Sequence, residues 1–188
     1  MKNLLLLISC VTLLGCTSAS SNGVPANSRP VANENTTAEV QKTSFEYMAE
    51  GSKYYLAGDY KNAIPPYQKA FDLEKQERKL DRKLWIALVD NLGMSYGISG
   101  DIKASFGVFE YGISKEPTYP LFYYNMACGY GELGNEDNAI KWLRPAFKNK
   151  ANMIEGERFP NPETDSSFEK FRESEKFKKA ISEMKSGK

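Results

Sequence analysis

The sequence of 188 residues contains no histidine. Without an imidazole, Ser-His-Asp and Cys-His catalysis are excluded, as are most zinc sites and any histidine-based pH switch. The sequence has only three cysteines, and no two of them have the CxxC spacing of a redox or metal motif. We therefore expect a protein that is not an enzyme and that uses no cofactor or metal.

An excess of charge is also lacking. The chain has 25 lysines and arginines against 24 aspartates and glutamates, which gives a formal net charge of +1. A nucleic-acid-binding surface and a site for strongly acidic substrates both favour a basic excess. The balanced composition therefore predicts no nucleic-acid partner.

The apolar run from Leu4 to Leu14 is too short to cross a bilayer as a helix, since a span needs about 20 residues. It follows the short basic start Met1-Lys2-Asn3, an arrangement typical of secretory signal peptides. The run ends in Leu13-Leu14-Gly15-Cys16. The thiol of Cys16 thus directly follows a small residue at the end of an apolar segment.

This ending resembles the lipobox of bacterial lipoproteins. The resemblance implies that Cys16 receives a diacylglycerol thioether, that residues 1–15 are removed as a signal peptide, and that Cys16 is then often acylated again. Two or more acyl chains form a stable anchor. By the same resemblance, Thr17 after the cysteine, rather than aspartate, implies the outer membrane, facing the periplasm. The alternative is an ordinary secretory signal with a chance cysteine.

Residues 16–43 are rich in serine, threonine, asparagine, alanine and proline, and they include no aromatic residue. Such a composition buries too little apolar surface to fold. We expect a flexible tether with a typical reach of roughly 30 Å. Once Cys16 is lipidated, Cys128 is the one free thiol of the mature chain, so no intramolecular disulfide is expected.

From residue 44 onward, a pattern repeats around Gly58, Gly100 and Gly134. Glycine permits a left-handed turn between two helices, small residues let helix axes approach, and large residues fill the holes beside them. The pattern therefore predicts helical hairpins. Each glycine has a tyrosine four residues before it, a small residue seven before and five after, and a large residue nine after: Tyr54, Gly51, Ala63 and Tyr67; Tyr96, Gly93, Ser105 and Phe109; Tyr130, Ala127, Ala139 and Leu143.

The second and third glycines are 34 residues apart, and the first and second are 42 apart. A 34-residue period with this order of tyrosine, small and aromatic residues resembles the tetratricopeptide repeat (TPR) family. We place three units at 44–77, 86–119 and 120–153. The resemblance implies an all-α fold, a right-handed α-α superhelix of about three TPR hairpins with a C-terminal helical cap.

The first unit departs from this pattern in two ways. Eight extra residues near 78–85 predict a longer second helix, and this charged insert is either a docking site or a solvated extension. Pro65 and Pro66 fall in the second turn of a helix that Asp59 is expected to cap, where they remove two backbone donors. We expect that helix to be kinked or to start afresh near Pro65.

Residues 154–188 are predicted to form a loop followed by capping helices. Glu155 and Glu157, on either side of Gly156, are interpreted as solvated loop acids. The spacing from Ser166 to Glu169 matches a capping box. An apolar stripe at Phe177, Ile181 and Met184 predicts a helix that covers the last apolar face of the array. The alternative is an amphipathic helix that binds a partner.

The TPR resemblance also implies that the first helix of each hairpin lines a concave groove for an extended peptide or a partner helix. Asn91 and Asn125 are 34 residues apart and are predicted to stack, with amides free to bond a peptide backbone. Alternatively, they satisfy the hairpins themselves. The candidate groove residues are Phe45, Met48, Tyr55, Asp90, Asn91, Met94, Tyr124 and Asn125.

Together these patterns predict a lipid-anchored interaction scaffold or adaptor in a bacterial cell envelope. The expected partner is an envelope protein or an extended peptide, and the anchor at Cys16 is the expected contact with the membrane. These groove positions hold no lysine or arginine, so a clamp for a terminal carboxylate is not expected. The alternative is a periplasmic module that binds a small molecule or carbohydrate in a tyrosine-lined groove.

Overall fold

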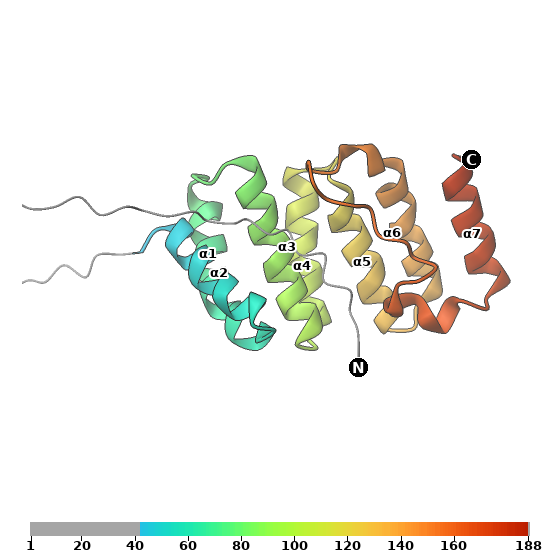
Figure 1. Ribbon diagram of the computed structural model, residues 1–188, viewed down its shortest axis with the longest axis horizontal. Coiled ribbons are helices and arrows are strands. Elements are labelled where there is room, and N and C mark those ends of the chain that lie inside the picture. Colours follow the sequence, from blue (N-terminus) through green and yellow to red (C-terminus); the bar gives the residue numbers. More distant parts are fainter. Residues whose placement is uncertain (1–41, 188) are drawn as a thin grey trace, which may run out of the picture.

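The computed structural model describes residues 42–187, and over this range it contains helices and no strand. Three helical hairpins are stacked one after another along the long axis of the protein (Figure 1). They consist of α1 (Ser44–Leu56) with α2 (Tyr60–Gln76), α3 (Arg82–Ile98) with α4 (Ile102–Lys115), and α5 (Pro120–Glu132) with α6 (Glu136–Lys148). The all-α prediction is confirmed. The predicted signal peptide, Cys16 and nearly all of the tether lie outside the described residues.

The three hairpin turns share one construction. Gly58, Gly100 and Gly134 have φ values of 75°, 95° and 69°, a conformation that costs glycine little. In each turn the N–H of the residue after the glycine donates to the carbonyl of the tyrosine four residues before it, at 2.9–3.0 Å. That same following residue caps the next helix through its side chain, as predicted for Asp59.

The packing within the hairpins follows the predicted pairing of small and large residues. A Cβ added to Gly51 would lie 2.6 Å from the ring of Tyr67, and one added to Gly93 would lie 2.5 Å from the ring of Phe109. In the third hairpin, the corresponding Ala127 is fully buried. Small residues therefore let each helix pair approach closely enough for one large side chain to fill the space between the helices.

Helix α2 runs without a break through Pro65 and Pro66. The predicted restart near Pro65 is therefore wrong, and the alternative of a kink stays a prediction. The two prolines leave the carbonyls of Lys61 and Asn62 without their helical donors. Both of these residues are exposed, so water reaches their carbonyls. The cost of the missing donors is therefore small enough for the helix to continue from its cap at Asp59.

The eight extra residues are divided among three places. Relative to the turn glycines, α2 ends three residues later than α4, α3 begins four residues earlier than α5, and the intervening loop is one residue longer. The longer second helix is confirmed, but the longer α3 was not expected. The loop between α2 and α3 is held in place by the buried side chain of Glu74. Its carboxylate accepts from the N–H groups of Lys79 and Leu80 and from the Ser44 hydroxyl.

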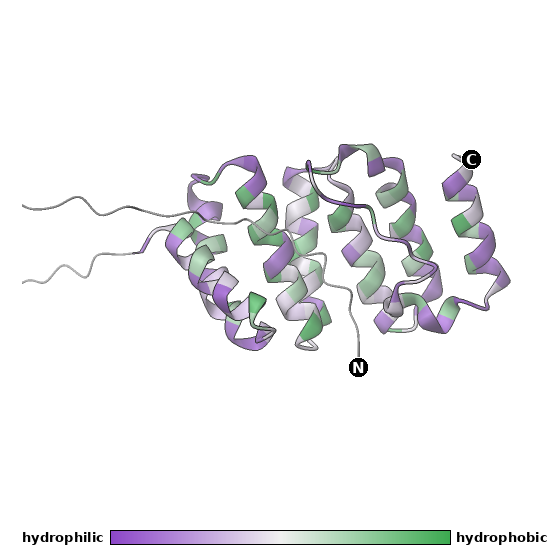
Figure 2. Ribbon diagram, viewed as in Figure 1, coloured by the Kyte–Doolittle hydropathy of each residue, from purple (hydrophilic) through white to green (hydrophobic). Residues whose placement is uncertain are grey.

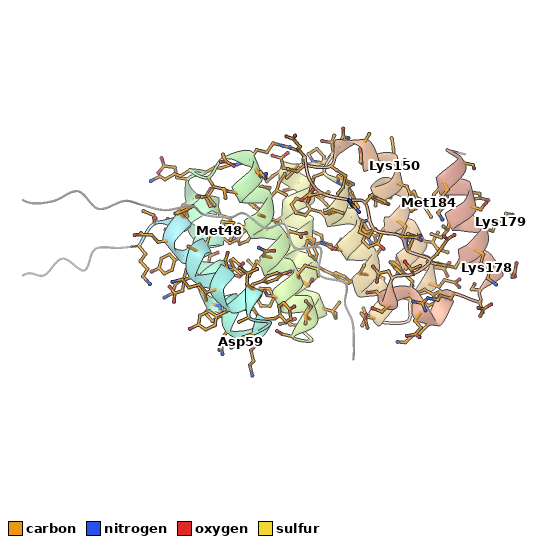
Figure 3. The ribbon with its side chains drawn as sticks, viewed as in Figure 1. Met48, Asp59, Lys150, Lys178, Lys179 and Met184 are labelled. Atoms are coloured by element: carbon orange, nitrogen blue, oxygen red, sulfur yellow. The ribbon has the colours of Figure 1, made fainter. Side chains whose placement is uncertain are left out.

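The C-terminal region covers the third hairpin. A 3-10 helix, η2 (Ser166–Phe171), packs on α5, and α7 (Glu175–Ser186) packs on α6, while the short η1 (Lys150–Asn152) follows α6. Phe177, Ile181 and Met184, the residues of the predicted apolar stripe, are buried, which confirms that this helix covers the last hairpin. The outer side of α7 is hydrophilic (Figure 2), and Lys179 lies on the side of the helix away from Met184 (Figure 3).

One detail of this region differs from the prediction. The side chain of Asp165, not that of Ser166, caps η2, by accepting from the N–H of Ser167 at 2.9 Å. The predicted capping box from Ser166 to Glu169 is therefore wrong, because the N-cap is Asp165 and the residue three positions after it is Phe168. The start of α7 has its own cap, in which Ser174 accepts from the N–H of Phe177.

Candidate interaction surface

The first helices of the hairpins are neighbours, because α1 contacts α3 and α3 contacts α5. We call the side of the array that these three helices form the first-helix surface. The predicted groove residues all come from these helices, but their exposure differs. Phe45 is exposed, Met48 and Tyr124 are buried, and the others are half-buried: Tyr55, Asp90, Asn91, Met94 and Asn125.

The amides of Asn91 and Asn125 are used inside the array. Asn91 donates to the Tyr67 hydroxyl at 3.2 Å, and that hydroxyl donates to Ser52 at 3.1 Å. Asn125 donates to the carboxylate of Asp90 at 2.6 Å. Each asparagine therefore bonds to the preceding hairpin. The geometry favours the structural interpretation of these residues over peptide binding.

Residues 153–165, which we call the strap, cross α5 and α6 after η1 (Figure 1). Tyr124 donates its hydroxyl hydrogen to Asp165 at 2.9 Å, and Tyr119 donates to Glu157 at 2.9 Å. Phe159 meets the rings of Tyr124 and Phe147 edge to face, with centroids 5.6 and 5.1 Å apart. The chain itself thus occupies the part of the first-helix surface on the third hairpin.

The strap changes two predictions. Tyr124 cannot contact a partner while the strap is in place, because it is 2% exposed. Glu157 is half-buried and bonded to Tyr119, so its interpretation as a solvated acid is wrong, whereas Glu155 is exposed as expected. No periodic pattern in the sequence indicates these contacts, which join residues 38 and 41 positions apart.

Under the strap, Asp90 has an unusual environment. Burial, together with the negative charge of Glu157, raises the pKa of Asp90 to about 7, and the hydrogen bond from Asn125 opposes this shift only in part. Burial also raises the pKa of Tyr119 and of Tyr124, so both phenols remain protonated donors. The site therefore contains three carboxylates, those of Asp90, Glu157 and Asp165, together with neutral hydroxyl groups.

Cys128 lies beside the same strap, with its sulfur 4.0 Å from Asp165. Burial, and then the charge of Asp165, raises the pKa of the Cys128 thiol. A thiol with a raised pKa is a poor nucleophile, because the thiolate is the reactive form. This environment indicates a packed rather than a reactive cysteine.

Two sequence matches to chemical motifs are explained by packing. Residues 93–97 have the spacing Gly-x-Ser-x-Gly, which in hydrolases marks a nucleophile on a strand-to-helix turn. Here Ser95 is fully buried within α3 and donates to the carbonyl of Asn91 at 2.7 Å.

In addition, no group of three or more acidic or cysteine side chains suited to a metal ion occurs within residues 42–187.

Residues 129–134 have the spacing Gly-x-Gly-x-x-Gly, which in nucleotide-binding proteins opens a helix after a strand. Here the stretch closes α5 and leads into the hairpin turn. A Cβ on Gly129 would lie 2.3 Å from the ring of Phe106, and one on Gly131 would lie 2.3 Å from the carbonyl oxygen of Ser167. Close packing accounts for both of these glycines, and the turn accounts for Gly134.

The unobstructed part of the first-helix surface lies on the first two hairpins. Phe45 on α1 is 43% exposed, and Leu56 and Ile98, at equivalent positions before their turns, are 64% and 38% exposed. The outer side of α1 also carries a shallow depression between apolar and charged side chains: Lys42, Phe45, Glu46, Ala49, Glu50, Lys53 and Tyr54. This end of the array presents apolar side chains that no other part of the described chain covers.

None of the helices between residues 42 and 187 is both long enough and apolar enough to span a bilayer. No protein-family model matches this sequence, and no curated protein is significantly similar to it.

Proposed function

We propose that this protein is a lipid-anchored TPR protein of a bacterial cell envelope that acts as a protein–protein interaction scaffold. The observation that carries the proposal is the repetition of one turn and one small-to-large contact in successive hairpins. The first helices of these hairpins are adjacent and leave apolar side chains exposed on α1 and α3. The lipobox resemblance at Leu13–Cys16 supports the anchor, and Thr17 in place of aspartate supports the outer-membrane location.

The binding surface in this proposal lies on the first two hairpins. The strap covers the third, and the amides of Asn91 and Asn125 are engaged, so apolar contact rather than amide recognition has to provide the affinity. Phe45 and Ile98 are the exposed side chains best suited to bury surface against an extended peptide or a partner helix. The partner is therefore expected to present apolar side chains to α1 and α3.

The surface is tested by capturing partners from detergent-solubilised envelope with the full-length protein and measuring the affinity of the main partner. Phe45→Ala with Ile98→Ala should weaken binding about tenfold or more, because buried aromatic and aliphatic contacts are lost. Leu133→Ala is the matched control, since Leu133 is exposed at the third hairpin turn. Unchanged affinity in the double variant, with normal circular dichroism, would contradict the proposed surface.

The anchor is tested separately by Cys16→Ser, which removes the thiol that accepts the lipid. This variant should leave the membrane fraction for the soluble fraction. If it still fractionates with membranes in high salt, lipidation at Cys16 is not what holds the protein there.

A further inference from the structure

The exposed side of α1 carries a stripe of apolar and small side chains. Phe45 and Leu56 are 43% and 64% exposed, and half-buried Ala49 and Ser52 lie between them. Their spacing of four, three and four residues places all four side chains along one face of the helix. Helix α1 lies at the end of the array opposite α7 (Figure 1), and the described elements that pack on it are mainly α2 and α3.

Two opposite charges lie beside this stripe, on the same flank of the helix. Glu46 and Lys53 are exposed and seven residues apart, and each directly follows a member of the stripe. Lys53 forms no ion pair within the described part of the chain. The carboxylate of Glu46 accepts from Thr43 in the capping box, and Glu50 is already paired with Lys42 at 2.8 Å. One cation and one anion on α1 are therefore available to a partner.

This arrangement is complementary to itself in an antiparallel pair of α1 helices. When Phe45 of one copy lies opposite Leu56 of the other, Ala49 lies opposite Ser52, and a twofold axis repeats both contacts. Glu46 then lies beside Lys53 of the second copy, so the pair gains two ion pairs. Charges that flank an apolar stripe in this way determine which helix binds and in which direction it runs. Here they favour a second α1 in the antiparallel direction.

The sizes of the stripe residues also suit this pairing. Ala49 and Ser52 are small and lie at the centre of the stripe, so two helix axes can approach closely there. Phe45 and Leu56 are large and lie near its ends, where each would cover the other across the pair. The same combination of small and large side chains packs the helices within each hairpin.

We propose that α1 binds the α1 helix of a second copy of this chain in an antiparallel pair, which forms a twofold dimer at the open end of the array. The inference rests on the proposed function and names a second copy as the partner of the α1 part of the first-helix surface. A contact between two single helices is smaller than a standard interface of about 1,600 Å². The dimer is therefore expected to be weak and to depend on protein concentration, which a shared membrane raises locally.

The test measures energy transfer between donor-labelled and acceptor-labelled pools of the purified full-length protein. Protein concentrations run from about 1 to 200 µM, the range of weak complexes. Detergent micelles are kept in excess over protein, so that two lipid anchors do not share a micelle by chance. Energy transfer in the parent should rise with concentration, and excess unlabelled protein should abolish it.

Charge reversal identifies the contact. Lys53→Glu places a second carboxylate beside Glu46 of the other copy, twice in each dimer, and should weaken association about tenfold or more. Glu46→Lys should weaken it similarly, because it brings two lysines together. The variant with both changes restores opposite charges and should associate within about threefold of the parent. Lys103→Glu is the matched control, since it makes the same charge change at an exposed position of α4 and should associate as the parent does.

Folding is controlled within this set. Glu46→Lys removes an acceptor of the capping box of α1, and the double variant has the same loss. Recovery of association in the double variant therefore cannot come from improved folding. Circular dichroism of each variant should match that of the parent.

Three results overturn the proposal. One is a parent that stays monomeric over the whole concentration range, whether another protein or residues 17–41 then cover the stripe. The others are a Lys53→Glu protein that associates as the parent does, and a folded double variant that stays dissociated. Because purified protein is used, none of these results changes the capture of a partner from the envelope, which tests the proposed function separately.

Discussion

The first and third hairpins have the same turn, and their first helices, α1 and α5, both have 13 residues. Their surroundings, however, are opposite. The outer side of α1 is open and mixes Phe45 with four charged side chains, whereas α5 and α6 are covered by the strap, η2 and α7. Every repeat array has two ends where the regular packing stops. Among residues 42–187, the first end of the array stays open, whereas the C-terminal region closes the other end. Under the proposed function, partners would approach from the first end.

The largest expected effect comes from removing the covered end. Truncation after Glu163 removes the side chains that bury apolar surface on the third hairpin: Phe168, Phe171, Phe177, Ile181 and Met184. At roughly 1.5–3 kcal/mol for each, the loss exceeds about 5 kcal/mol, a large part of a typical domain's stability. The Tm should fall by more than about 15 °C, or the chain should not fold.

The matched control for this truncation shortens the other end. A chain that begins at Lys42 keeps α1 complete, and the residues before it are predicted from their composition to be a tether. Its Tm should equal that of the parent. A C-terminal truncation that melts like the parent would mean that the two ends do not differ in the way described.

The next effect compares equivalent glycines in the first two hairpins. Gly93→Ala should lower the free energy of unfolding by about 2–4 kcal/mol, because the new methyl group meets Phe109 in a region packed on both sides. Gly51→Ala meets Tyr67 just as closely. Among residues 42–187, however, the first hairpin has a neighbouring hairpin on one side only, so we expect it to adjust more easily. The loss in Gly51→Ala should be smaller by about 1 kcal/mol in urea unfolding.

Gly107→Ala is the control for these substitutions. Gly107 lies within α4, and an added Cβ would meet nothing within 4 Å. Alanine is the better helix former, so this variant should gain about 0.5–1 kcal/mol. Equal losses at Gly51 and Gly93 would show that the open end is as rigid as the middle of the array.

A smaller effect is expected at the joint between the first two hairpins. Glu74→Gln leaves one neutral oxygen to accept from the N–H groups of Lys79 and Leu80, and its amide nitrogen can only donate, so the bond with the Ser44 hydroxyl has to reverse its direction. The expected loss is about 1–3 kcal/mol, measured by urea unfolding. Glu77→Gln, at an exposed position three residues on, should change stability by less than about 0.5 kcal/mol; similar losses in both variants would refute the role assigned to Glu74.

The smallest effect should be a gain at the open end. Pro65 is exposed, so Pro65→Ala loses no packing and restores a donor to the carbonyl of Lys61. We expect an increase of about 1 kcal/mol in the free energy of unfolding. Pro66→Ala is the comparison, because Pro66 is buried and its replacement also removes apolar contacts. A loss of stability in Pro65→Ala would mean that the ring of Pro65 stabilises the folded protein.

The hairpins could be predicted because their determinants are local and repeat. A glycine turn, the following capping side chain and the small-to-large pairing are all visible within about 30 residues of sequence. The continuation of α2 through its prolines was not predictable from propensity alone, because it depends on the exposure of Lys61 and Asn62. Of the candidate binding residues, Phe45 is open as expected, whereas Tyr124 is covered.

The strap could not be predicted because its contacts follow no period. Tyr119 meets Glu157 and Tyr124 meets Asp165 across long sequence separations, through an irregular segment with two prolines. The bond between Ser44 and Glu74 is of the same kind. Such pairs are determined by where the assembled helices leave room and unpaired polar groups, and a single sequence carries no direct signal for that.

The asparagines that bond backward along the array have a consequence for how the hairpins choose their stacking. Apolar contacts already favour one alignment of the second and third hairpins, because the ring of Phe106 on α4 lies where a side chain on Gly129 of α5 would be. Asn91 meets Tyr67, and Asn125 meets Asp90, in one alignment of successive hairpins only. A hairpin shifted by one turn would leave an amide and its acceptor dehydrated and unpaired, a penalty of about 1–3 kcal/mol at each interface. These two side chains therefore add a polar preference for the same alignment of the hairpins that the apolar contacts favour.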